Sequence, residues 1–159
     1  MPKISDISNI LEQKVDLTEF FGEEAFVTLR RLNKYQFSLL LNRSRQGYST
    51  LLYTKMSEYG EDLTPEDFNA VRESITPEEA EDRLTKESEI DREYYSYSIK
   101  KDGHNFTDDE DQLVELDGGA FYDTYSGLTS NSGVSLNDFL INKIIIFNRR
   151  GIELGKPTD

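Results

Sequence analysis

Apolar and polar residues alternate at two places near the start of the chain, which is the pattern of half-buried β-strands. Val15 and Leu17 are separated and flanked by polar residues, and a second strand-like run covers residues 25–32. Residues 21–24, Phe-Gly-Glu-Glu, predict a turn between the two runs because glycine tolerates a positive φ angle. We therefore expect a β-hairpin over residues 14–32.

Apolar residues recur every three or four positions in three other segments, and this spacing predicts helices. A short helix is expected at residues 4–11, and a longer one at 33–46 starts at a capping asparagine and stops before a glycine. In the third segment, residues 135–150, isoleucines on several sides favour either a deeply buried helix or a partly β-branched strand. We predict a helix there, whereas residues 48–57 fit helix and strand equally well.

The middle of the chain contains two clear helix starts. Thr64-Pro65 and Thr76-Pro77 each place a capping hydroxyl before a proline, and acidic residues follow in the first turn. Further along, residues 94–99 alternate in polarity and predict a strand. Glycine, serine and asparagine dominate residues 126–133, which predicts a loop.

Together these elements predict an α+β fold, mainly helical, with an N-terminal β-hairpin packed on the helices. The length of 159 residues favours a single domain over residues 1–159. Within it we expect the hairpin and first long helix at 14–46, an acidic helical segment at 58–93, a variable loop region at 94–134 and a C-terminal helix at 135–150.

Charge is distributed unevenly along this chain, whose formal net charge is −13. Residues 1–57 carry eight basic and six acidic side chains, residues 58–93 four and fourteen, and residues 94–159 six and eleven. A protein that binds a phosphate backbone needs a basic face, so the balance argues against a nucleic-acid partner. The simplest interpretation of residues 58–93 is one exposed acidic helix or a pair of them.

Composition narrows the chemistry further. The chain has no cysteine and one histidine, which excludes disulfides, thiolate zinc sites, a cysteine nucleophile and any mechanism with paired histidines. The longest apolar run, residues 144–147, is far shorter than the roughly 18 residues that a membrane span needs. The first residues also lack an apolar stretch of signal-peptide length. We therefore expect a soluble, intracellular protein without a membrane partner.

Two features invite a chemical interpretation. His104 follows a turn-like Asp-Gly pair, but no nucleophile motif accompanies it, so a histidine hydrogen-bonded in a loop is the favoured interpretation. The acidic run Asp108–Asp111 lacks the spacing and the glycine of an EF-hand, which leaves only an incidental cation site open. We expect no enzyme, no catalytic residue, no metal site and no cofactor.

The two ends of the chain resemble one known family. Residues 14–32, KVDLTEFFGEEAFVTLRRL, resemble the opening of tail assembly chaperones of long-tailed phages and prophages. In that family an extended segment and a strand ending in arginine and leucine precede a leucine-rich helix. Residues 137–148, NDFLINKIIIFN, resemble the closing helix of the same family, where an isoleucine-rich run ends in Phe-Asn. The intervening residues carry no such resemblance.

The resemblance implies a non-enzymatic function in virion morphogenesis. Such chaperones coat the long tape-measure protein and keep it soluble until tail-tube subunits polymerise around it, in the cytoplasm of the bacterial host. The implied partners are the tape-measure and tail-tube proteins, and a homo-oligomer is left open. Two alternatives remain, namely an acidic inhibitor that mimics DNA and another phage structural or connector component.

A binder of an amphipathic helix needs an apolar groove with a charged rim. The helices predicted at 33–46 and 136–148 carry more apolar residues than one buried stripe requires, so we expect part of them to contact a partner. The residues expected to form this groove are Tyr35, Leu39, Phe139 and Ile146, and the acidic segment 58–93 would form its rim. The alternative is that both helices are simply the core of the protein.

Overall fold

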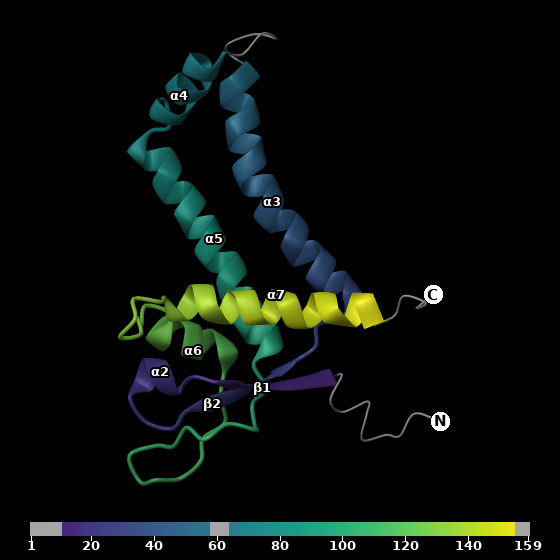
Figure 1. Ribbon diagram of the computed structural model, residues 1–159, viewed down its shortest axis with the longest axis vertical. Coiled ribbons are helices and arrows are strands. Elements are labelled where there is room, and N and C mark those ends of the chain that lie inside the picture. The colour runs from purple at the N-terminus through teal and green to yellow at the C-terminus, as the bar shows by residue number, and fades with distance from the viewer. Residues whose placement is uncertain (1–10, 58–63, 155–159) are drawn as a thin grey trace. The chain divides into compact units, whose positions relative to one another are not determined.

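The computed structural model describes residues 11–57 and 64–154 of the chain (Figure 1). Contacts divide these residues into two compact units. Unit 1 comprises the described residues up to Lys34 together with those from Asp91 onward, and unit 2 lies between Tyr35 and Ile90. The short helix expected at residues 4–11 lies outside the described residues, apart from its last position. The single domain expected over residues 1–159 stays a prediction.

The hairpin of unit 1 confirms the expected N-terminal pairing. Strands β1 (Glu12–Asp16) and β2 (Phe26–Arg30) are antiparallel, with Val15 opposite Val27. Between them the structure places a short helix, α2 (Thr18–Phe21), where the sequence predicted a simple turn at 21–24. The helix ends at Gly22, whose φ of 72° lies in the left-handed region that glycine adopts without strain. Burial of Phe20 on this helix explains why the connection is longer than a tight turn.

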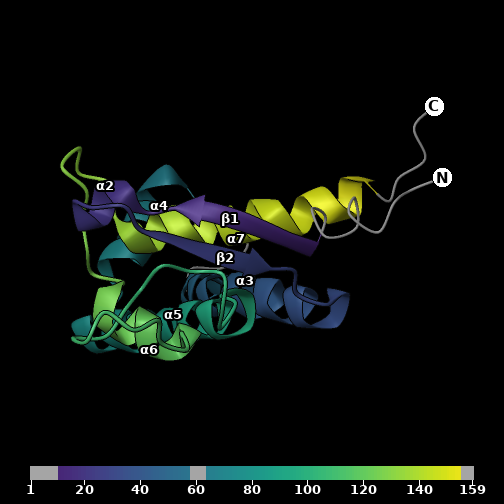
Figure 2. The ribbon, with the colours of Figure 1, turned by 90° about the horizontal axis from the view of Figure 1, so that it is seen from below.

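The C-terminal helix, α7 (Leu136–Leu154), is the long apolar element of unit 1, and the hairpin lies along it (Figures 1 and 2). Leu136, Leu140 and Ile144 repeat every four residues and are fully buried. This one-sided burial confirms the helix and rules out the β-branched strand that the sequence left open. Buried Asn148 links α7 to the segment that follows the hairpin, because its Oδ1 accepts a hydrogen bond from the Leu32 backbone N–H at 2.9 Å.

Two predictions for residues 94–134 are wrong. Residues 94–98 are the end of helix α5 (Pro77–Ser98) and do not form the predicted strand. The buried side chains Ile90, Tyr94 and Ser98 recur every four residues, so helical packing decides the conformation despite the alternating Tyr-Ser pattern. A trace of strand pairing remains only at Ile99, which forms an isolated bridge with Leu29.

The predicted loop region also contains a second helix, α6 (Gly118–Tyr125). Asp117 caps it by accepting from the Ala120 backbone N–H at 3.0 Å. A Cβ atom on Gly118 would lie 2.6 Å from the Tyr95 carbonyl carbon and nearer still to its oxygen. Glycine is therefore required here because the start of α6 packs directly on the backbone of α5.

Unit 2 consists of helices. α3 (Lys34–Ser57), most of which belongs to this unit, continues past Gly47, so the predicted stop there is wrong and the ambiguous residues 48–57 are helical. A glycine in a helix interior costs only about 1 kcal/mol relative to alanine, which a long helix tolerates. α4 (Pro65–Glu73) and α5 begin at the two predicted starts, because Thr64 and Thr76 each form a capping box. With the hairpin of unit 1, these helices confirm the α+β class.

Candidate partner-binding surface

The four residues predicted to bind a partner are divided between the two units. Tyr35 and Leu39 lie on α3 in unit 2 and are 75% and 44% exposed. Ile146 lies on α7 in unit 1 and is 46% exposed, whereas Phe139 on the same helix is half-buried, 5.3 Å from the ring of Phe20. The alternative, that the helices are simply core, therefore does not hold for Tyr35, Leu39 and Ile146. A groove formed by all four residues stays a prediction.

Within unit 1, three residues form an apolar stripe with a cation at its centre, which we call the α7 flank: Phe139, Lys143 and Ile146. Their spacing of four and three residues puts them on one side of the helix. Lys143 Nζ lies 5.4 Å from the centroid of the Phe139 ring, so the ammonium group sits over an aromatic face. The flank therefore offers both apolar area and positive charge to a partner.

Arg31 adds a second cation beside the same helix. Its Nη2 donates to the Phe147 carbonyl oxygen at 3.3 Å, and its guanidinium carbon lies 4.9 Å from the Phe147 ring centroid. Burial lowers the pKa of Arg31 below its usual value, and its Nε is buried without a hydrogen-bond partner. No carboxylate of the residues described in the structure forms an ion pair with it. The sequence alone showed an ordinary arginine at this position.

In unit 2 the first part of α5 carries the acidic surface. Several of its charges are already neutralised by ion pairs, Lys55–Glu79 at 2.8 Å, Arg83–Glu87 at 3.2 Å and Lys86–Asp82 at 3.0 Å. Glu78, Glu81 and Glu89 form no ion pair with any described residue. Leu84 lies one turn after Glu81 and is 58% exposed. This surface is acidic and carries one large exposed apolar residue, and the rim expected over residues 58–93 stays a prediction.

His104 is held by its own loop. The Phe106 backbone N–H donates to Nδ1 at 3.0 Å, and Nε2 lies 3.0 Å from the Lys101 carbonyl oxygen. A backbone N–H can only donate and a carbonyl can only accept, so the ring is assigned as the neutral tautomer with its proton on Nε2. The ring is 8% exposed. The expected loop histidine is confirmed, and its irrelevance to any activity stays a prediction.

The acidic run at 108–111 is a tight turn. Asp108 Oδ1 accepts from the backbone N–H groups of Glu110 and Gln112 at 2.9 and 3.0 Å, and Thr107 pairs with Leu113 across the turn. The first carboxylate of the run is thus occupied by the backbone. In the described parts of the chain no three acidic or histidine side chains are grouped to hold a metal ion.

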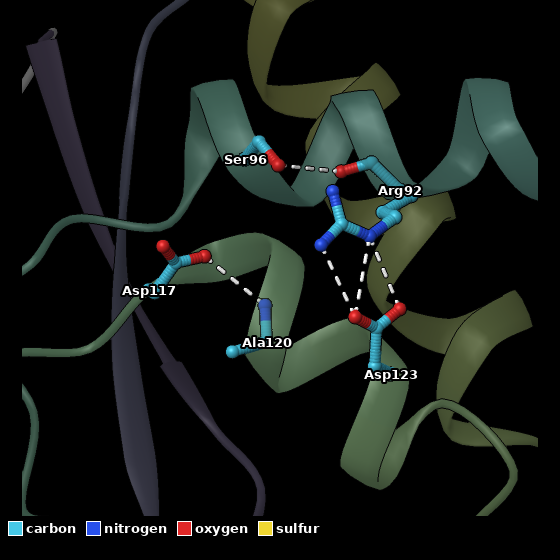
Figure 3. Close-up of polar contacts among 5 residues, drawn as sticks. All are labelled: Arg92, Ser96, Asp117, Ala120 and Asp123. Carbon is cyan, nitrogen blue, oxygen red and sulfur yellow. Dashed lines mark hydrogen bonds and ion pairs between the residues drawn. The ribbon is translucent and has the colours of Figure 1, made fainter.

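A polar contact joins α5 to α6 within unit 1 (Figure 3). Arg92 donates from Nε and Nη2 to both carboxylate oxygens of Asp123, at 3.1–3.3 Å, and this pair raises the pKa of Arg92. Ser96 Oγ donates to the Arg92 carbonyl oxygen within α5. A Cβ on Gly119 would lie 2.8 Å from the Arg92 guanidinium carbon. The contact holds α6 against α5, and the charges of Arg92 and Asp123 are paired with each other.

Comparison with known proteins identifies no relative of this chain. No family model matches the chain, and searches of curated proteins and of solved structures give no match. Among the described helices, none is long and apolar enough to cross a membrane.

Proposed function

We propose that this protein is a non-enzymatic tail assembly chaperone of a long-tailed phage or prophage. It would bind the tape-measure protein in the cytoplasm of the bacterial host and release it to the growing tail tube. The observation that carries the proposal is that the two segments with the family resemblance pack on each other. Leu32 and Asn148, which are hydrogen-bonded, are 116 residues apart, and Phe20 contacts Phe139.

Exposed apolar side chains on helices support a binding role. Tyr35 and Ile146 expose large apolar surfaces on two long helices, and Leu39 lies one turn after Tyr35. Side chains of this kind bind the apolar stripe of an amphipathic helix, and neighbouring charge keeps the complex in solution. The tape-measure protein, a long helical chain with apolar stripes, is a partner of that chemistry.

The charge density of α5 makes a DNA mimic the weaker candidate. Glu78, Glu81 and Glu89 span about 16 Å at the helical rise of 1.5 Å per residue. Double-stranded DNA presents one charge per about 1.7 Å, several times the density of these three carboxylates. Glu79, Asp82 and Glu87 of the same helix are in ion pairs with Lys55, Lys86 and Arg83.

Co-expression with tagged fragments of the tape-measure protein from the same phage or prophage tests the proposal. We expect the full chain to be retained by at least one helical fragment and the complex to survive high salt, because apolar burial is not screened. Tyr35→Glu should leave the circular dichroism spectrum unchanged and weaken retention at least tenfold. Leu113→Glu is the matched control, since Leu113 is 70% exposed in a loop of unit 1.

Two outcomes would contradict the chaperone proposal. Failure of every fragment to retain the chain removes the partner on which the proposal depends. Binding of a DNA-binding protein that falls steeply between low and high salt would favour the mimic, because that contact depends on charge.

A further inference from the structure

We propose that the α7 flank of unit 1 docks the acidic face of α5 from a second copy of this chain. The contact would be head-to-tail, because the two surfaces belong to different units of the molecule. It shares Ile146 with the surface that the chaperone proposal assigns to a partner, but it is tested with copies of this chain alone, so its failure would leave the chaperone proposal standing.

The first surface is apolar and cationic. Phe139 and Ile146 are separated by about 10 Å along α7 at 1.5 Å per residue, and Lys143 lies between them. Lys143 forms no ion pair within the described chain, and neither does Arg149, which is exposed just beyond Ile146. Arg31 lies beside the same helix, as shown by its contact with Phe147. Such a surface favours an acidic helix with an apolar residue on its contact side.

The second surface has that chemistry. Ile90 is buried on α5, Glu81 lies on the opposite side of the helix, and Glu78 and Glu89 lie about 60–80° around the axis from Glu81. Glu81 and Glu89 are about 12 Å apart along the axis, close to the length of the α7 flank. Leu84 lies about 60° around the helix from Glu81, on the side away from Glu78 and Glu89, and is 58% exposed. The two surfaces thus match in length and carry opposite charge, and each offers an apolar side chain.

Cations beside α7 that form no ion pair with the described residues favour the docking of a second copy. Lys143 and Arg149 form no ion pair with the described residues, so a carboxylate brought to them breaks no existing pair. Attraction between the flank and a helix with three unpaired glutamates acts locally at the contact, against the overall repulsion between two chains of net charge −13. Because the two contact surfaces differ, each copy keeps one surface open, and the contact generates rings or chains of copies.

Sedimentation equilibrium of the full chain tests this contact. At about 50 mM salt we expect the average mass to rise above the monomer mass of 18.4 kDa as concentration increases. At about 500 mM salt the association should weaken at least tenfold, because opposite charges are then screened. A monomer mass at every concentration overturns the proposal, and so does association that salt leaves unchanged.

Charge reversal localises the contact. Lys143→Glu should weaken self-association at least tenfold, and a mixture of Lys143→Glu with Glu81→Lys should associate more tightly than Lys143→Glu alone. Lys101→Glu is the matched control, because Lys101 is exposed in unit 1, forms no ion pair with described residues and changes the net charge equally. Equal weakening by Lys101→Glu would assign the effect to net charge and overturn the proposed surface. Circular dichroism of each variant verifies that it is folded.

Discussion

Unit 1 and unit 2 hold their shape by different means. In unit 1, the rings of Phe21, Phe106, Phe121 and Tyr125, which come from three separate stretches of chain, form a cluster with centroids 5.0–6.5 Å apart. Buried backbone groups find distant partners there, as Leu32 does with Asn148. In unit 2 the capping boxes and the ion pairs one turn apart are local contacts, and the Lys55–Glu79 ion pair adds a contact between α3 and α5.

This difference affects how each unit responds to substitution. Aromatic burial and long-range hydrogen bonds make unit 1 sensitive to single changes far apart in the sequence. Unit 2 has few buried side chains among its described residues and several large exposed ones, including Tyr35, Phe68 and Leu84. Local interactions contribute about 1 kcal/mol or less each, so unit 2 is expected to tolerate substitutions that unit 1 does not.

The largest effect is expected at the contact between α5 and α6 in unit 1. Gly118→Ala would place a Cβ against the backbone carbonyl of Tyr95, which cannot rotate away as a side chain can. We expect a loss of about 3 kcal/mol or more in the free energy of unfolding, as for other overpacked core positions. Urea denaturation measures it. Gly127→Ala, with open space around its Cβ, should change stability by less than about 0.5 kcal/mol.

The second effect concerns the bond between the hairpin and α7. Asn148→Ala removes the acceptor of the Leu32 N–H and leaves that buried donor unpaired. We expect a loss of about 2 kcal/mol by thermal denaturation, from the penalty for a buried unsatisfied donor. Asn142→Ala on the exposed side of the same helix is the control and should cost less than about 0.5 kcal/mol. Equal effects from the two variants would contradict the assigned role of Asn148.

A smaller effect is expected in unit 2. Thr64→Ala removes the side-chain oxygen that accepts from the Asp67 N–H at 3.2 Å and breaks the capping box of α4. The cost should be about 1 kcal/mol. Hydrogen exchange should show faster exchange of α4 amides, while the amides of α7 in unit 1 keep their protection. Thr85→Ala is the control, because that hydroxyl only donates to the Glu81 carbonyl within the helix. Loss of protection in α7 would show that the units do not open separately.

The smallest expected effect concerns the ionisation of Tyr95, which changes the stability of the protein only at alkaline pH. Burial raises the pKa of Tyr95 well above its usual 10, with a further contribution from nearby Asp91. The folded state therefore keeps the phenol neutral while the unfolded state ionises, so this contribution to stability is complete below pH 10 and is lost as the pH rises above it. Stability measured between pH 9 and about 11 should fall less steeply in Tyr95→Phe than in the parent protein. Tyr97→Phe is the matched control, because Tyr97 lies on the same helix at an exposed position.

Local signals along the sequence determined a large part of the fold. The alternation around Val15 and Val27 predicted the hairpin, and the two Thr-Pro starts predicted where α4 and α5 begin. The four-residue repeat from Leu136 predicted α7. Each of these signals acts between residues that are neighbours in the chain or on one face of an element, so it can be recognised without knowing the tertiary contacts. His104 in its loop belongs to the same class, because its partners are two and three residues away.

Tertiary structure decided the rest. Residues 95–99, Tyr-Ser-Tyr-Ser-Ile, alternate in polarity as in a strand, and packing against other segments of unit 1 makes residues 94–98 helical. The start of α6 depends on the Tyr95 backbone meeting a glycine 23 residues later, and the missing counter-ion of Arg31 depends on which groups surround Phe147. The sequence proposed Tyr35 and Ile146 for the surface, but their exposure follows from which helix sides are covered. Burial and pairing depend on the distances between segments far apart in the chain, and a pattern of neighbouring residues does not contain those distances.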